Sequence, residues 1–62
     1  MTRYTVNVEP DEGMWHIRVP EISRSTAARN LDEVEFMARD LISLMTDQAP
    51  DAFELDVRID RS

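Results

Sequence analysis

The order of the elements is set by residues 30–59, which read NLDEVEFMARDLISLMTDQAPDAFELDVRI. The first part of this stretch has the spacing of one apolar helical face. Asn30 precedes that face as an N-cap, and Glu33 follows three residues later, as in a capping box. The apolar face consists of Leu31, Val34, Met37, Ala38, Leu41, Ile42 and Met45. The sequence therefore predicts a helix over about residues 31–46 that ends before Pro50.

A period of two replaces the helical spacing from residue 53 onward. Apolar side chains alternate with charged ones, which is typical of a strand with one buried face. The apolar positions are Phe53, Leu55, Val57 and Ile59, and they alternate with Glu54, Asp56, Arg58 and Asp60. We expect this strand to form an edge of the sheet, where an apolar row invites pairing with a second chain. The four apolar residues are therefore the predicted interface of a homodimer or higher oligomer.

The N-terminal part of the chain predicts a hairpin. Apolar residues recur at every second position in residues 4–8 and again in residues 15–19, so each segment is typical of a half-buried strand. The intervening Pro-Asp-Glu-Gly at residues 10–13 has the residue types of a turn and is expected to end the first strand. Pro20 is expected to end the second strand, because it cannot donate to the ladder. A run of small residues, 25–28, predicts a third short strand that pairs back on the second.

Together these elements predict an α+β fold with the order β-β-β-α-β. The helix crosses one face of the sheet, and the last strand then lies parallel to the first through a right-handed connection. We expect one domain over residues 1–62, with a four-stranded mixed sheet in the order 3-2-1-4 and one helix on one face. Trp15 is expected beneath the helix. The opposite face is the predicted partner-binding surface, with an ordinary solvated sheet face as the alternative, and it is formed by Met14, His16, Arg18, Glu54, Asp56 and Arg58.

Composition restricts the chemistry. The 62 residues include no Cys and one His, which excludes disulfides and thiolate metal sites and argues against a structural zinc. Thirteen acidic residues against seven basic ones give a net charge of −6. This charge argues against nucleic acid as a direct partner and favours a basic protein, with simple solubility as the alternative. No apolar run approaches the roughly 20 residues of a membrane span, so we expect a cytoplasmic protein.

Two apolar residues of the predicted helix lie outside its apolar face. Phe36 and Leu44 are eight residues apart, so they fall on one side of the helix about two turns from each other. They widen the apolar arc beyond what one sheet face needs. The pair therefore hints at a second contact surface, with simple partial burial as the alternative.

The N-terminal segments resemble the start of the HicB-like antitoxins. Residues 4–12 (YTVNVEPDE) and 15–22 (WHIRVPEI) follow that family's pattern of an alternating strand, an acidic turn and a strand that ends in Val-Pro and a hydrophobic residue. Residues 30–34 (NLDEV) match the Thr-Leu-x-Glu-Ala pattern at which the family's helix starts. The resemblance covers about residues 3–59. It departs where the family usually has glycines, because this chain has Ser23-Arg24 and Ala28-Arg29 there.

The resemblance implies a partial ribonuclease-H-like fold that binds a small basic toxin. In the family, HicB covers the catalytic His of HicA, an RNase that cleaves mRNA. Many HicB-like antitoxins continue into a DNA-binding domain, whereas this sequence stops at Ser62, so the resemblance implies the toxin-binding half and contact with nucleic acid only indirectly, if at all. One alternative is an oligomeric nucleic-acid-binding regulator. The basic residues that could contact nucleic acid are Arg18, Arg24, Arg29 and Arg58. Another is a structural module without a toxin.

We expect no catalytic residue, no metal and no cofactor. Ribonuclease-H-like nucleases hold two metal ions on carboxylates of the first strand, the helix and the last strand. Here the centre of the first strand is Asn7, and the helix acids lie opposite the apolar face. The carboxylates that could be considered as ligands of such metal ions are Glu9, Glu33, Asp40 and Asp56. His16 is the only His and has no partner set for nucleophilic catalysis.

Overall fold

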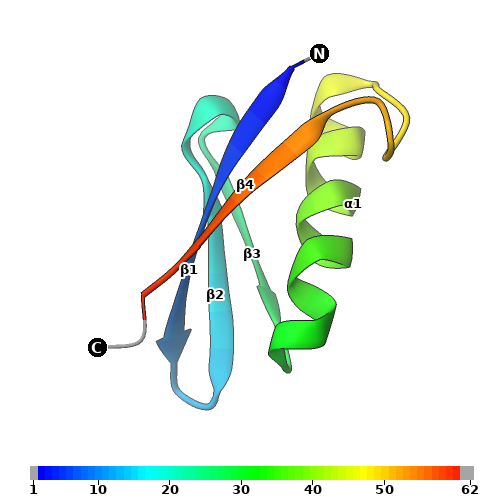
Figure 1. Ribbon diagram of the computed structural model, residues 1–62. Coiled ribbons are helices and arrows are strands. Elements are labelled where there is room, and N and C mark those ends of the chain that lie inside the picture. The colour runs from blue at the N-terminus through cyan, green and yellow to red at the C-terminus, as the bar shows by residue number, and fades with distance from the viewer. Residues whose placement is uncertain (1, 61–62) are drawn as a thin grey trace.

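The structure, a computed structural model, describes residues 2–60 and contains one sheet and one long helix (Figure 1). The strands are β1 (Arg3–Asp11), β2 (Met14–Val19), β3 (Arg24–Ala28) and β4 (Glu54–Ile59), and the helix is α1 (Val34–Thr46). Single 3-10 turns, η1 (Pro20–Ile22) and η2 (Leu31–Glu33), follow β2 and precede α1. The strand order is β3-β2-β1-β4, with β1 antiparallel to β2 and parallel to β4. The predicted α+β fold with the order 3-2-1-4 is confirmed.

The hairpin between β1 and β2 is tighter than the sequence predicted. Pro10 does not end the strand but pairs with Trp15, and the turn is the dipeptide Glu12-Gly13. Both turn residues have positive φ, 52° and 82°, as a two-residue hairpin loop of type I′ requires. The strand tolerates Pro10 because the backbone nitrogen of Pro10 faces the β4 side of β1 and not the β2 side. The β4 strand has already ended there, at the pair Val8 and Ile59, so no ladder donor is lost.

The start of the helix follows the predicted cap. The side chain of Asn30 accepts a hydrogen bond from the Glu33 N–H at 3.1 Å, and the Glu33 carboxylate accepts one from the Arg29 N–H at 3.4 Å. The first turn is a 3-10 turn, η2, so the α-helix itself begins at Val34. It ends at Thr46, because Asp47 adopts a left-handed conformation with φ of 59° and donates its N–H to the Ser43 carbonyl. An αL cap of this kind usually contains Gly.

The core lies between α1 and one face of the sheet. The residues it buries come from β1, β2, β3, the helix and the position just before β4: Tyr4, Val6, Val8, Ile17, Val19, Ala28, Val34, Ala38, Ile42 and Phe53. Trp15 packs against this cluster but is only partly buried. The prediction placed Trp15 on the correct face of the sheet but overestimated how deeply its side chain is buried.

Arg39 joins the helix to the crossover segment that leads into β4. Its Nη1 donates to the carbonyl oxygens of Pro50 and Phe53 at 2.8 and 3.0 Å, and its Nε donates to Glu35 at 3.1 Å. The guanidinium carbon lies 5.5 Å from the centre of the Phe53 ring. That ring meets Tyr4 edge to face at 5.3 Å. These contacts position the start of β4 beside β1.

The helix packs mainly on β2 and β3, which leaves part of β4 uncovered. Phe53, just before β4, is 2% exposed, whereas Val57 and Ile59 are each 41% exposed. Phe53 was predicted to belong to an oligomer interface; that prediction is wrong, because the core already buries this side chain. Leu55 is half-buried, and Val57 and Ile59 remain at the edge strand.

Candidate functional site

The face of the sheet opposite α1 carries every residue of the predicted partner-binding surface. The strand pairs place Arg18, Asn7 and Arg58 in one row across β2, β1 and β4. His16 and Glu9 form the next row toward the hairpin, and Met14 pairs with Asp11 at its end. On the other side of the arginine row lie Thr5 with Asp56 and then Arg3 with Glu54. We refer to this surface as the open face.

A shallow depression of about 420 Å³ lies on the open face. Its polar lining residues are Asn7, Glu9, His16, Arg18, Arg58 and Asp60. The His16 side chain is 38% exposed, and its Nδ1 lies 3.8 Å from a Glu9 carboxylate oxygen. Three of the six predicted surface residues, His16, Arg18 and Arg58, thus surround one concavity, whereas Met14, Glu54 and Asp56 lie outside it.

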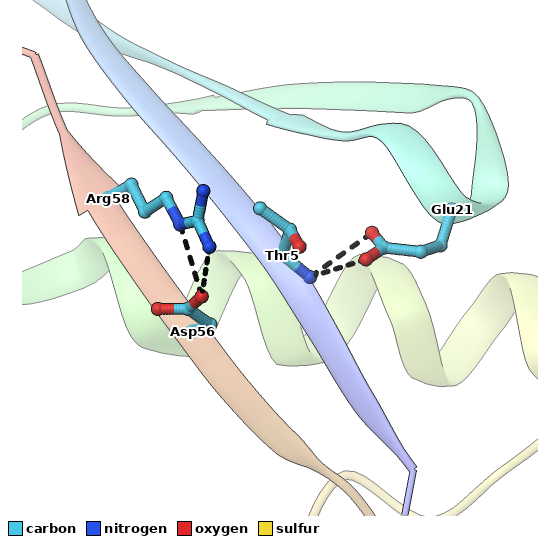
Figure 2. Close-up of polar contacts among 4 residues, drawn as sticks. All are labelled: Thr5, Glu21, Asp56 and Arg58. Carbon is cyan, nitrogen blue, oxygen red and sulfur yellow. Dashed lines mark hydrogen bonds and ion pairs between the residues drawn. The ribbon is translucent and has the colours of Figure 1, made fainter.

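Acidic and basic side chains are interleaved on the open face. Arg58 donates from Nε and Nη2 to one oxygen of Asp56, at 3.1 and 2.8 Å, and Arg3 donates to Glu54 at 3.0 Å. Figure 2 shows the Arg58 guanidinium directed from β4 toward β1, with Asp56 beneath it. A surface of paired, alternating charges fits the mixed side chains of a protein partner better than the uniform phosphates of a nucleic acid.

Glu21 is a member of the open face that the sequence analysis missed. Because β2 ends at Val19, the Thr5 N–H on β1 has no strand partner on that side. The two carboxylate oxygens of Glu21, in the turn η1, accept this N–H at 3.1 and 3.0 Å (Figure 2). The signal was present in the sequence, since an acidic residue follows directly the Pro20 that ends the strand.

The surroundings of Glu21 favour its charged form. Desolvation opposes ionisation, but the hydrogen bonds from the backbone N–H groups of Glu21 and Thr5 and from the Thr5 side chain, with the positive charge of Arg58, outweigh it. The pKa of Glu21 is therefore held below its ordinary value of 4.5. A fixed carboxylate thus stands beside the arginine row.

The four arginines considered for nucleic-acid binding are only partly brought together. Arg18 and Arg24 line a second depression beside η1, together with Pro20, Ser23 and Ser25. Arg58 shares the first depression with Arg18 but is paired with Asp56. Arg29 follows β3 at the start of the helical segment and lines neither depression.

The carboxylates considered for a metal site are separated by the sheet. Glu9 and Asp56 lie on the open face, whereas Glu33 and Asp40 are exposed on the helical side. Within residues 2–60 the structure brings together no group of three or more His, Asp or Glu residues that could hold a metal ion. Over the same residues, no helix has the length and apolar character needed to cross a membrane.

The outer side of α1 carries the two apolar residues that lie off its buried face. Phe36 and Leu44 are 70% and 71% exposed, so their hydrophobic surface is almost entirely open. Asp40 lies between them along the helix and is also exposed. This outer helix surface is the second place on the molecule where a partner could bind.

No family model, no curated protein and no solved structure matches this chain. The residues and geometry of the open face are therefore the features that indicate a function.

Proposed function

We propose that this protein is a HicB-like, antitoxin-type binding protein that sequesters a small basic protein on its open face. The observation that carries the proposal is the arrangement of that face: two arginines flank Asn7 in one row, and carboxylates lie in the rows on both sides. Such alternation offers acceptors to a partner's Arg and Lys side chains and donors to its carboxylates. The net charge of −6 would accelerate the encounter with a basic partner.

The topology is compatible with this proposal. The resemblance implied a partial ribonuclease-H-like fold, and a sheet in the order 3-2-1-4 with a helix on one face leaves the other face free for a partner. Under this proposal the toxin is an mRNA-cleaving RNase, the antitoxin itself performs no catalysis, and the pair acts in the cytoplasm. The partner-binding residues would be Met14, His16, Arg18, Glu54, Asp56 and Arg58, joined by Asn7, Glu9 and Glu21.

The proposal predicts that a small basic protein is encoded beside this gene, and the test measures binding to that protein, purified with its catalytic His replaced. Glu9→Arg with Glu54→Arg reverses two exposed charges on the open face, on β1 and β4. We expect this double variant to weaken binding by at least 100-fold in isothermal titration calorimetry, because like charges placed together at an interface cost several kcal/mol. Its fold should survive, since the ion pairs lost with Arg3 and His16 are exposed and worth about 0–1 kcal/mol each.

The matched control is Asp40→Arg with Asp51→Arg. These residues are exposed on α1 and in the crossover segment, away from the open face, and the control changes the net charge by the same amount. It should bind like the wild type. Loss of binding in the control alone would move the site to the outer helix surface. Absence of binding by the wild-type protein would contradict the proposed function itself.

A further inference from the structure

The outer edge of β4 carries backbone groups that no strand of this sheet uses. β4 is the last strand in the order and pairs with β1 alone. Glu54 donates its N–H to the Thr2 carbonyl and Asp60 donates to the Val8 carbonyl, so the even-numbered residues of this segment turn their backbone groups toward β1. The odd-numbered residues, Leu55, Val57 and Ile59, therefore turn theirs outward. Such an edge is a template for a further strand.

The side chains of β4 divide between two environments. Leu55, Val57 and Ile59 pair with Tyr4, Val6 and Val8 of β1 and so lie on the helix side of the sheet. Because α1 packs on β2 and β3, Val57 and Ile59 remain 41% exposed there. On the open face, Asp56 and Arg58 form an ion pair within the strand, at 2.8 Å. One edge thus combines free backbone groups, exposed apolar side chains and both signs of charge.

We propose that β4 pairs with β4 of a second copy of this chain, antiparallel, about a two-fold axis at Val57. In this register each Asp56 lies opposite Arg58 of the second copy, and each Leu55 lies opposite Ile59 of the second copy. Val57 meets its own counterpart on the axis. The outward backbone groups of Leu55, Val57 and Ile59 then become hydrogen-bonded pairs, and the two sheets form one continuous sheet of eight strands.

Charge and the alignment of the apolar row together favour this register over its neighbours. An axis at Asp56 would place the two Asp56 carboxylates directly opposite each other and, although each Glu54 would face Arg58 of the second copy, it would leave Ile59 opposite Phe53, which the core already buries. An axis at Arg58 would oppose the two guanidinium groups and set each Asp56 against Asp60 of the second copy. An axis at Val57 instead forms two Asp56–Arg58 pairs, at the closely spaced positions of the ladder where side chains interact most. Its like-charged pairing, Glu54 with Asp60 of the second copy, occurs twice by symmetry but lies at the two ends, where Arg3 pairs with Glu54 at 3.0 Å.

The apolar side of the same register covers the part of β4 that the helix leaves open. The three apolar residues of each copy would meet on the helix side of the joined sheet. A 62-residue domain buries about 60% of the surface that its unfolded chain exposes, less than a larger domain does, and covering this row on dimerisation would offset that deficit. The inference concerns the edge of the sheet and does not depend on the partner proposed for the open face.

The test is sedimentation equilibrium of the wild type and of two charge-reversal variants, Asp56→Arg and Arg58→Asp. The wild type should have twice the 7.2 kDa monomer mass at about 100 μM, a concentration at which a Kd of about 1 μM gives mostly dimer. Each single variant opposes like charges twice across the axis and should be a monomer at the same concentration. An equimolar mixture of the two variants restores both attractive pairs, so it should form the heterodimer.

Two outcomes would overturn the proposal. One is a wild type that remains monomeric at about 100 μM, the concentration set above. The other is a pair of variants that fold normally by circular dichroism but do not associate on mixing. Asp51→Arg and Arg29→Asp are the matched controls, because they make the same two charge changes at exposed positions away from β4, and both should remain dimeric. The partner-binding test leaves Asp56 and Arg58 intact, and its Glu54→Arg change removes a like-charged pairing across the proposed axis, so loss of partner binding and loss of the dimer are separate outcomes.

Discussion

Arg39 makes the contacts that hold the crossover segment to the helix, and its replacement by Met tests how β4 is positioned. Arg39→Met keeps the aliphatic stem but removes the hydrogen bonds to the Pro50 and Phe53 carbonyls, the contact with the Phe53 ring and the ion pair with Glu35. A hydrogen bond from a charged donor contributes about 1.5–3 kcal/mol. The two bonds share one donor nitrogen, and the side chain is 27% exposed, so their combined contribution is expected near the lower limit.

The remaining contacts add smaller amounts. A cation–π contact at a partly exposed site contributes about 0.5–1 kcal/mol, and an i,i+4 ion pair contributes about 0.3–0.5 kcal/mol. We therefore expect Arg39→Met to lower the free energy of unfolding by about 2–3 kcal/mol. A domain of 62 residues has about 3–9 kcal/mol in total, so this single residue accounts for a large share of it.

Urea unfolding followed by the fluorescence of Trp15, the only Trp, measures this change. With a slope of about 1 kcal/mol per molar urea, as expected for a small domain, the midpoint should fall by about 2–3 M. Arg24→Met is the control, since Arg24 is exposed at the start of β3, and it should change the midpoint little. A difference below about 0.5 kcal/mol, typical of surface substitutions, between Arg39→Met and the wild type would refute the role given to Arg39.

Three further predictions concern the cap, the hairpin and the fixed carboxylate. Asn30→Ala removes the acceptor for the Glu33 N–H, so it should cost about 1 kcal/mol and lower the Tm by about 4–8 °C in a thermal melt; an unchanged Tm would contradict the capping role. Glu12→Asn places a residue that tolerates positive φ in the turn and should raise the Tm by roughly 2–4 °C, whereas a lower Tm would argue against the two-residue turn. Because the pKa of Glu21 is lower in the folded protein, its ionisation stabilises the fold above its ordinary pKa of 4.5, and this contribution disappears as the pH falls through the lowered value. The stability difference between the wild type and Glu21→Gln should therefore be present at neutral pH and vanish in acid, and a difference independent of pH would show that the charge plays no part.

The fold was predictable because each element carries its own local signal. The alternation of Tyr4, Val6 and Val8, the Asn30 cap and the apolar face of the helix each depend on neighbouring residues alone. Once the order β-β-β-α-β is known, the right-handed crossover leaves few arrangements of the sheet.

Details that depend on tertiary position were not predictable in the same way. In the sequence, Pro10 predicts the end of a strand. The strand continues through it because β4 has already ended beside Pro10, so the missing backbone N–H of Pro10 breaks no pairing. Phe53 continues the alternation of β4, but it precedes the strand and the crossover turns it into the core beside Tyr4 and Arg39. The period of two predicts on which face of the sheet a side chain lies, but it does not predict how deeply that side chain is buried. It therefore could not distinguish the buried Phe53 from the exposed Val57 and Ile59.

The residues of the open face were predictable from the sequence, but their positions relative to one another were not. Alternation assigned His16, Arg18, Asp56 and Arg58 to one face of the sheet, where the structure places them. The row of Arg18, Asn7 and Arg58 depends on how three strands are aligned with one another. That alignment is known only once the strands are paired in the structure. Glu21 lies in a turn with no periodicity, so its bond to the Thr5 N–H depends on where β2 stops.

The central claim, that the open face binds a basic protein, is tested most directly by mapping the contact surface. Backbone amide resonances of the isotope-labelled protein would be followed by NMR while the unlabelled small basic protein that the proposal predicts is added. We predict that the largest shifts fall on Asn7, Glu9, His16, Arg18 and Arg58, around the depression on the open face. Shifts concentrated on α1 around Phe36, Asp40 and Leu44, with the open face unchanged, would contradict it.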